Sequence, residues 1–301
     1  MTLVARILPA DPASRAASLS VYLNVGLVVL KVSVGIAAGS VAVLSDGIDS
    51  GQDLVSAIIA LASVRFGARP ADEGHPYGHG RIETMAASFQ AMLIGGGGVF
   101  IVASAVYRLI EPPTEIGYDI GLVAMLIAAA ANLLLVRYTS RIARETQSPA
   151  IASEARHLWT NVVQAGAIMV GLVLVALTDE VAFDAIFALL LGVYLLWTCT
   201  SILWSAVGDI LDKRLTREEL SQIDSAIVAE GVDGYHLLRT RRSGQVRQID
   251  FHITLPGEMT VDDSHAVSER IEARIEALWP GSVVTVHVEP IGTDPSEDAG
   301  L

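Results

Sequence analysis

Six long apolar stretches constrain this chain more than any other feature of its sequence. A transmembrane helix needs about 20 mostly apolar residues, and six stretches have that length: 17–38, 41–66, 84–110, 120–138, 157–178 and 181–207. The chain is 52% hydrophobic and 18% charged, whereas soluble domains average roughly 25% charged residues. The sequence therefore predicts a membrane-embedded bundle of six transmembrane helices within residues 1–209.

Basic residues lie on alternate connections between these stretches. Arg65, Arg69 and Arg81 surround the connection after the second stretch, and a further group of arginines follows the fourth. The connections "AGS", "EPPTEIGYD" and "TDEVAFD" contain no basic residue. Because Lys and Arg favour the cytoplasmic side of a membrane, we expect a multi-pass protein of the inner membrane with both termini in the cytoplasm.

The composition changes after residue 209. The segment "LTREELSQIDSAIVAE" carries a helix-capping pattern, and "GYHLLRTRRSGQVRQIDFHITL" indicates two alternating strands around the turn "RSGQ". A second amphipathic helix follows in "TVDDSHAVSERIEARIEALWP", and a third strand in "GSVVTVHVEP". This αββαβ order predicts a small α+β domain over residues 210–291, with two helices on one sheet face. Residues 292–301 are predicted to be disordered.

Three aspartates interrupt the second apolar stretch. Asp46, Asp49 and Asp53 are spaced so that they share one face of a helix. Carboxylates inside a membrane span are costly, and they commonly mark a path for ions or protons. The alternative is that they belong to a water-filled loop or to a buried hydrogen-bond network.

The fifth stretch opens with "RHLWTN", which places His157 and Asn161 one helical turn apart. Carboxylates, an imidazole and an amide oxygen would form a nitrogen and oxygen site for a divalent first-row metal if the two helices touch. The alternative for His157 and Asn161 is a hydrogen bond between helices.

Histidines outside the apolar stretches suggest two further sites. In the loop "ADEGHPYGHGRIE", His75 and His79 follow Asp72, and these three side chains could hold Zn²⁺ with an open fourth position. The C-terminal domain contains His236, His252, His265 and His287. Glu289 is predicted to share a sheet face with His287, since residues two apart on a strand point the same way.

Other classes of protein are disfavoured. The net charge is −13 and the chain has a single cysteine, so neither a nucleic-acid surface nor a thiolate cluster is expected. A membrane metallohydrolase would need a general base beside the metal ligands, and the sequence offers none. We therefore expect a transporter and not an enzyme.

Taken together, "HPYGHGRIE", "SDGIDSGQDLVS" and "RHLWTN" resemble the cation diffusion facilitator family, especially its bacterial zinc and ferrous-iron efflux members. The resemblance covers nearly the whole chain. It implies a homodimeric antiporter in the lipid bilayer that exchanges a divalent metal for H⁺, with a ferredoxin-like cytoplasmic domain. Zn²⁺ is the expected substrate and regulatory ligand, with Fe²⁺, Mn²⁺, Co²⁺ and Cd²⁺ as alternatives.

The resemblance also implies which residues bind metal. Its transport site falls on Asp49, Asp53, His157 and Asn161. Its loop site falls on Asp72, His75 and His79. Its cytoplasmic site, which stabilises the dimer, falls on His236, His252, His265, His287 and Glu289. A structural charge pair falls on Arg81 and Asp212.

One residue departs from the family pattern. Asn161 stands where the family usually has Asp, and a neutral amide is a weaker ligand than a carboxylate. Asp46 could restore the missing negative charge by lying next to the ligands without binding the metal itself. The departure keeps open the alternative of a non-transporting metal sensor or partner subunit with a degenerate membrane site. The sequence does not distinguish export from import.

Overall fold

The computed structural model describes residues 11–38, 41–111, 121–178, 180, 182–232 and 234–292. Within these ranges, the side chains of Asp46 and Asp49 are among those that lie outside the description. The chain divides into two compact units, Met1–Val207 and Gly208–Leu301, and each is described by itself.

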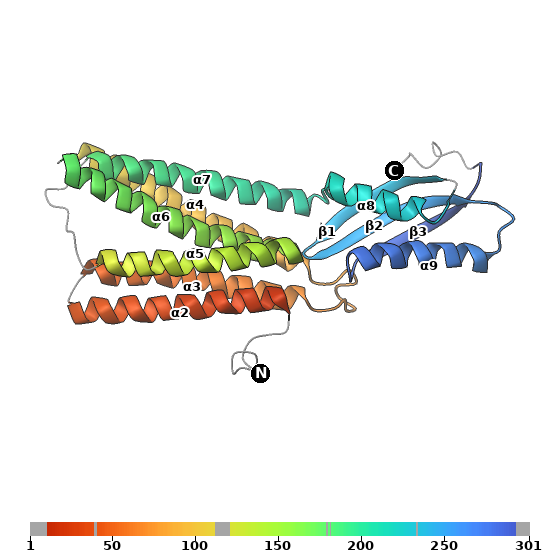
Figure 1. Ribbon diagram of the computed structural model, residues 1–301, viewed down its shortest axis with the longest axis horizontal. Helices are drawn as coiled ribbons and strands as arrows, with labels where there is room; N and C mark the ends of the chain where they lie inside the picture. The colour runs from red at the N-terminus through yellow and green to blue at the C-terminus, as the bar shows by residue number, and fades with distance from the viewer. Residues whose placement is uncertain are drawn as a thin grey trace. The chain divides into compact units, whose positions relative to one another are not determined.

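Long helices make up the described part of the first unit (Figure 1). They are α2 (Pro12–Ala38), α3 (Val41–Gly67), α4 (Arg81–Ile110), α5 (Gly121–Thr146), α6 (Pro149–Thr178) and α7 (Ala182–Ile210). Helix α2 packs along α3, and α5 packs along α6. Helix α6 also contacts α3 and α4. Helices α3 and α6, which carry the predicted transport ligands, are therefore neighbours.

Several of these helices extend beyond the apolar stretches at the ends that carry arginines. Helix α5 continues from residue 138 to Thr146, and α6 begins at Pro149 instead of His157. Proline suits the first helical position because its missing N–H would have no helical acceptor there. As a result His157 lies about two turns inside α6, not at its start.

Three described helical segments are long and apolar enough to cross a membrane by length and composition: Pro12–Ser33, Arg81–Ile110 and Ala185–Ile210. The sequence predicts six spans, so the other three stay a prediction. Helix α3 illustrates why composition alone does not decide the question, because its three aspartates lower its hydropathy.

Small residues set the approach of α4 to α7. A Cβ atom added at Gly98 would lie 3.1 Å from the Cβ of Leu195, and one added at Gly192 would lie 3.1 Å from the Gly98 carbonyl oxygen. Around this crossing, Ala91 and Ile94 of α4 form a buried cluster with Leu191 of α7. Gly95 and Gly98 of the run "GGGG" therefore serve close helix packing, as small residues in membrane helices commonly do, whereas Gly96 and Gly97 line a cavity.

The second unit has the predicted αββαβ order: α8 (Arg217–Val228), β1 (Gly234–Ser243), β2 (Val246–Leu255), α9 (Val261–Leu278) and β3 (Val283–Pro290). The Thr216 side chain accepts from the backbone N–H of Glu219, and the Glu219 side chain accepts from that of Thr216. This reciprocal cap starts α8 where the sequence predicts it. Gly244, with φ of +61°, forms the turn between β1 and β2.

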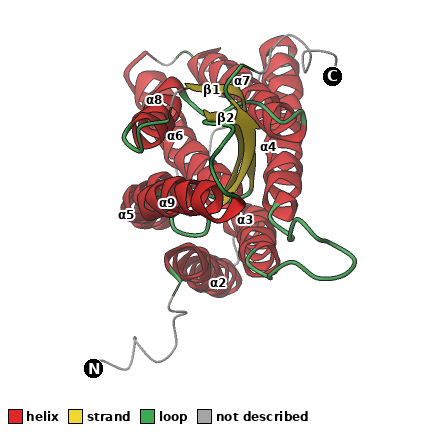
Figure 2. Cartoon of the chain, turned by 90° about the vertical axis from the view of Figure 1, so that its right-hand side faces the viewer, coloured by secondary structure: helices red, strands yellow, loops and turns green. Residues whose placement is uncertain are grey.

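The three strands form a sheet in the order β1-β2-β3, with β1 antiparallel and β3 parallel to β2. Both helices pack on the same sheet face (Figure 2), where Ile223 of α8 and Ile271 of α9 meet Phe251 of β2. Successive strand residues point to opposite faces. The face opposite α8 and α9 therefore carries His252, the neighbour of Phe251.

Candidate metal centres

Helices α3 and α6 bring two of the predicted transport residues together. His157 Nε2 lies 2.9 Å from Asp53 Oδ1, and the two side chains are 12% and 22% exposed. Asn161, one turn further along α6, lines the same cavity of about 540 Å³. The predictions for Asp49 and Asp46 concern side chains outside the described part of the chain. An imidazole beside a carboxylate at a largely buried position can bind a divalent metal.

Several polar atoms at this cavity have no hydrogen-bond partner among the described residues. They are His157 Nδ1, Asn161 Nδ2 and, from α5, Asn132 Oδ1. Buried polar groups are normally satisfied by a partner, by water or by a ligand. These atoms could therefore bind water, a polar ligand or an ion in the cavity.

Sequence reasoning missed other residues of this cavity. Lys31 of α2 and Asn132 of α5 line it, as do Thr160 and Gln164 of α6. Lys31 and Asn132 interrupt apolar runs, and that signal alone could have singled them out. Their meeting with Asp53 depends on how α2 and α5 pack, which no sequence pattern indicated.

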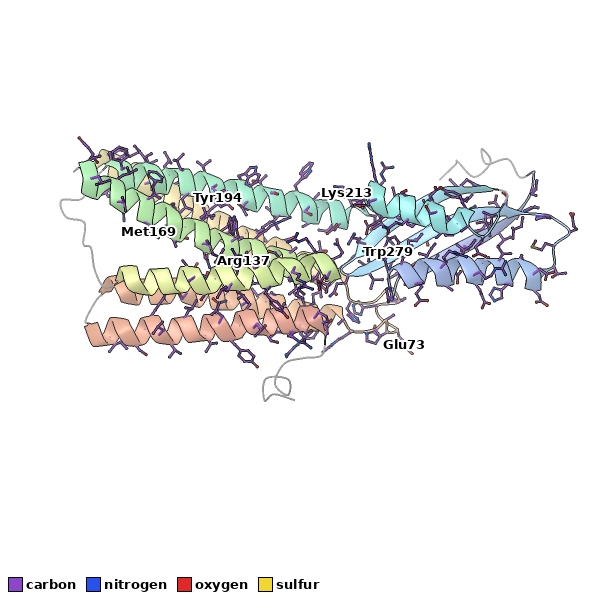
Figure 3. The ribbon with its side chains drawn as sticks, viewed as in Figure 1. Glu73, Arg137, Met169, Tyr194, Lys213 and Trp279 are labelled. Atoms are coloured by element: carbon purple, nitrogen blue, oxygen red, sulfur yellow. The ribbon has the colours of Figure 1, made fainter. Side chains whose placement is uncertain are left out.

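The loop between α3 and α4 gathers Asp72, His75 and His79. Asp72 Oδ1 lies 3.2 Å from His75 Nδ1, and Asp72 Oδ2 lies 3.4 Å from His79 Nε2. One possible ligand atom from each residue falls within 4.8 Å of the others. Glu73, labelled in Figure 3, lies in the same loop.

Local backbone geometry holds this group in place. The backbone amides of Gly74 and His75 donate to Asp72 Oδ1 at 3.0 and 2.7 Å. The amide of His75 is the main reason why the pKa of Asp72 lies below its ordinary value. The carboxylate therefore stays ionised, as metal binding requires.

The open face of the sheet in the second unit carries a row of histidines. His236 pairs with His252 across β1 and β2, and His252 pairs with His287 across β2 and β3. Their ring centroids are 5.2 Å and 4.6 Å apart. Glu289, 7% exposed, lies 2.5 Å from His252 Nδ1 and 3.2 Å from His236 Nε2.

Two predicted members of this group stand apart from that core. His287 is 63% exposed, with Nε2 3.9 Å from Glu289 Oε1. His265 lies on α9, which packs against the other sheet face, and its nearest acid is Glu269 at 3.4 Å. Within one chain, the structure therefore gathers His236, His252 and Glu289 and does not bring His265 to them.

The predicted pair between Arg81 and Asp212 would join the two units and stays a prediction. Within the second unit, Asp212 forms an ion pair with Arg241 at 3.1 Å.

Known proteins that are similar to this chain show its family. Residues 17–211 match the family description of a cation efflux transmembrane domain, and residues 215–291 match that of a cation efflux protein cytoplasmic domain. The cation-efflux pump FieF of Klebsiella pneumoniae subsp. pneumoniae is 33% identical over 289 residues, which cover 96% of each chain. The chain belongs to the cation diffusion facilitator family.

Other members of the cation diffusion facilitator family are similar over the same length or over one part. The FieF pump of Citrobacter koseri is 34% identical over 285 residues, covering 94% of this chain and 95% of that protein. The metal-bound C-terminal domain of the CzcD transporter from Thermotoga maritima is 30% identical, with a TM-score of 0.23. It covers 26% of this chain and 98% of that domain.

Family membership confirms the resemblance drawn from the sequence. This cation diffusion facilitator has a transmembrane cation efflux domain followed by a cytoplasmic domain that contains helices and strands.

Proposed function

We propose that this cation diffusion facilitator exports a divalent transition-metal ion across the inner membrane in exchange for protons, with Zn²⁺ as the first candidate. The observation that carries the proposal is the pairing of Asp53 with His157 at a cavity between membrane helices. Both relatives described above bear the name of cation-efflux pumps. We further propose six spans, cytoplasmic termini and a homodimer with a ferredoxin-like cytoplasmic domain.

The chemistry of these two side chains suits exchange of metal for protons. A metal ion requires an ionised carboxylate and a neutral imidazole, so its binding releases protons and proton binding displaces it. Imidazoles change their charge between about pH 5 and pH 8, within the range that cells use. Alternating exposure of the cavity to the two sides of the membrane would then couple the two flows. Asp49 and Asn161 are proposed as the remaining ligands.

The two clusters outside the membrane bundle are proposed to bind the same metal. Asp72, His75 and His79 offer three ligands in an exposed loop, which leaves a coordination position open. His236, His252 and Glu289 offer three more on the sheet. Metal bound there would stabilise the cytoplasmic domain and tie the activity of the dimer to the cytosolic metal supply.

A non-transporting metal sensor or partner subunit is the second candidate. Asn161 favours it, because an amide at the cavity gives a dication less compensating charge than a carboxylate would. Such a protein would still bind metal through the cytoplasmic domain and would carry no ion across the membrane.

Uptake of Zn²⁺ into inverted membrane vesicles, driven by an imposed pH gradient, tests the proposal. We expect uptake by the wild type, its loss in Asp53→Asn, and its retention in Glu73→Gln, which removes an acidic group from the exposed loop instead. A rate of Zn²⁺ uptake that does not change with the pH gradient would contradict proton exchange. The absence of any flux, with metal still bound by the cytoplasmic domain, would favour the sensor.

A further inference from the structure

Lys31 is a cationic side chain in the wall of the membrane cavity. It lies on α2, is 8% exposed, and lines the cavity together with Asp53 of α3 and His157 of α6. Lysines inside membrane spans are rare because the desolvation of their charge is costly, and those that occur commonly serve function.

The described charges that line the cavity are of both signs. Among the lining residues that the structure describes, Asp53 is the one carboxylate and Lys31 the one lysine or arginine. The remaining polar groups are His157 and neutral side chains, including Gln52, Asn132 and Asn161. Lys31 and Asp53 thus line one cavity with charges of opposite sign, which attract each other. A cation in this position stabilises the carboxylate whenever no metal ion is present.

The same charge repels an incoming dication. Two like charges at a largely buried position interact more strongly than they do in bulk solvent. A metal ion that binds at Asp53 and His157 must therefore compete with the attraction between Lys31 and Asp53 and also overcome repulsion by Lys31. Both effects weaken metal binding, and both favour release of the ion.

We propose that Lys31 is a resident cation of the transport cavity, which neutralises Asp53 when the cavity is empty and sets the metal affinity low enough for release. The inference deepens the proposed export function and rests on it. Lys31 is on this account a positioning residue that acts through Asp53. It does not ligate the metal.

The test removes the charge of Lys31 while keeping the size of its side chain. Lys31→Met and Lys31→Gln are neutral, and Lys31→Arg keeps the positive charge as the matched control. All are made in the full chain with His79→Ala and His252→Ala, so that the loop and cytoplasmic clusters do not mask the membrane site. Asp53→Asn in the same background provides the reference for lost binding. Zn²⁺ affinity is measured by competition with a fluorescent chelator, and Zn²⁺ release by stopped-flow mixing.

We expect the neutral variants to bind Zn²⁺ about tenfold more tightly than the parent, and to release it more slowly by a similar factor, while Lys31→Arg stays within about twofold. Equal or weaker binding in the neutral variants would overturn the inference. The inference would also be overturned if Lys31→Arg behaved like Lys31→Met, since the charge would then not set the affinity. It would be overturned as well if only Lys31→Arg could be made as a folded protein, since the charge would then serve folding.

The outcomes also separate this inference from the proposed function. If Asp53→Asn binds Zn²⁺ as the parent does, the proposed transport site itself is wrong. If Asp53→Asn loses binding while charge removal at Lys31 changes neither affinity nor release, the transport site stands and only the role of Lys31 fails.

Discussion

At the scale of single residues, Asn161 is the position where a change of one atom tests the transport site. Its side-chain nitrogen has no hydrogen-bond partner among the described residues and lies at the cavity that Asp53 and His157 share. We expect Asn161→Asp to raise Zn²⁺ affinity about tenfold, because a carboxylate adds both charge and a stronger ligand oxygen. Chelator competition on the purified protein measures the change.

The matched control is Asn132→Asp, which adds the same charge to the same cavity from α5. A smaller gain there would assign the Asn161 effect to ligation. An equal gain in both variants would mean that negative charge in the cavity, and not a fourth ligand, sets the affinity. Asp46→Asn extends the comparison: if it leaves affinity unchanged, Asp46 does not compensate for the amide.

At the scale of elements, a buried carboxyl group joins four helices about one helical turn before His157. Glu154 of α6 is 0% exposed. It accepts hydrogen bonds from Ser56 of α3 at 3.3 Å, from Gln90 of α4 at 3.1 Å, and from the Ser20 hydroxyl of α2. Gln90 also donates to the Ser56 carbonyl oxygen at 3.0 Å. The network therefore fixes α6, and with it His157, against three neighbours.

Because buried donors left without an acceptor are costly, we expect Glu154→Ala to lower the free energy of unfolding by roughly 2–3 kcal/mol. The apparent melting temperature of the full chain in detergent should fall accordingly. Glu145→Gln is the control, since Glu145 is half-exposed and forms an ion pair with Arg141 on the same helix. That variant should change the free energy of unfolding by less than about 0.5 kcal/mol. Equal melting temperatures for the two variants would show that the network does not hold the bundle together.

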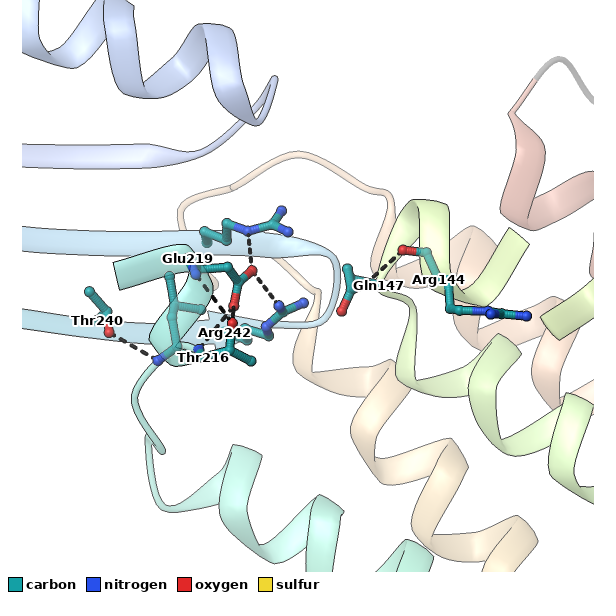
Figure 4. Close-up of polar contacts among 8 residues, drawn as sticks. Arg144, Gln147, Thr216, Glu219, Thr240 and Arg242 are labelled. Atoms are coloured by element: carbon teal, nitrogen blue, oxygen red, sulfur yellow. Dashed lines mark hydrogen bonds and ion pairs between the residues drawn. The ribbon is translucent and has the colours of Figure 1, made fainter. Parts of the chain in front are cut away.

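A second network fixes the start of α8 to the β-hairpin (Figure 4). Glu219 Oε1 accepts from Arg242 at 2.5 Å and from Arg247 at 3.0 Å, while Glu219 Oε2 accepts from the backbone of Thr216 at 3.0 Å. The guanidinium of Arg247 also stacks over Trp279 at 4.7 Å, at the end of α9 (Figure 3). Burial alone would raise the pKa of Glu219, but the Thr216 amide and Arg242 outweigh it and lower the pKa to about 2.

The pKa of Glu219 gives the pH dependence of this domain a definite sign. Its ordinary value of 4.5 lies above the value in the folded domain, so its stabilising contribution is complete above about pH 4.5 and is lost as the pH falls through about 2. Pepsin cleavage of the cytoplasmic domain in the full chain should therefore accelerate across this range. Glu219→Gln should remove this dependence and cost about 2 kcal/mol at neutral pH. Glu218→Gln, an exposed neighbour, should retain the dependence.

At the scale of the whole molecule, the sequence predicts local structure better than it predicts which distant residues come into contact. Capping and alternation predict α8, the Gly244 turn and β3, because those signals act between residues close in the chain. The pairing of β3 parallel to β2, and the direct row of His236, His252 and His287, depend on sheet topology. Likewise Lys31 and Asn132 join Asp53 only through the packing of α2, α3 and α5. Resemblance to a family supplied the ligand sets, and helical spacing alone could not.

The separation of His265 from the other cytoplasmic histidines leads to a prediction about assembly. If His236, His252 and Glu289 bind metal and this metal stabilises the dimer, removal of metal by a chelator should shift the full chain toward monomer, and Zn²⁺ should restore the dimer. His252→Ala should abolish that response, because His252 lies centrally in the row and 2.5 Å from Glu289. Analytical ultracentrifugation in detergent with and without Zn²⁺ measures the response.

His265→Ala is the comparison, since His265 lies on the other side of the sheet, beside Glu269. A dimer that responds to Zn²⁺ in His265→Ala but not in His252→Ala would limit the site to the open sheet face. Loss of the response in both would mean that His265 reaches the metal in the assembled dimer, as the family resemblance implies.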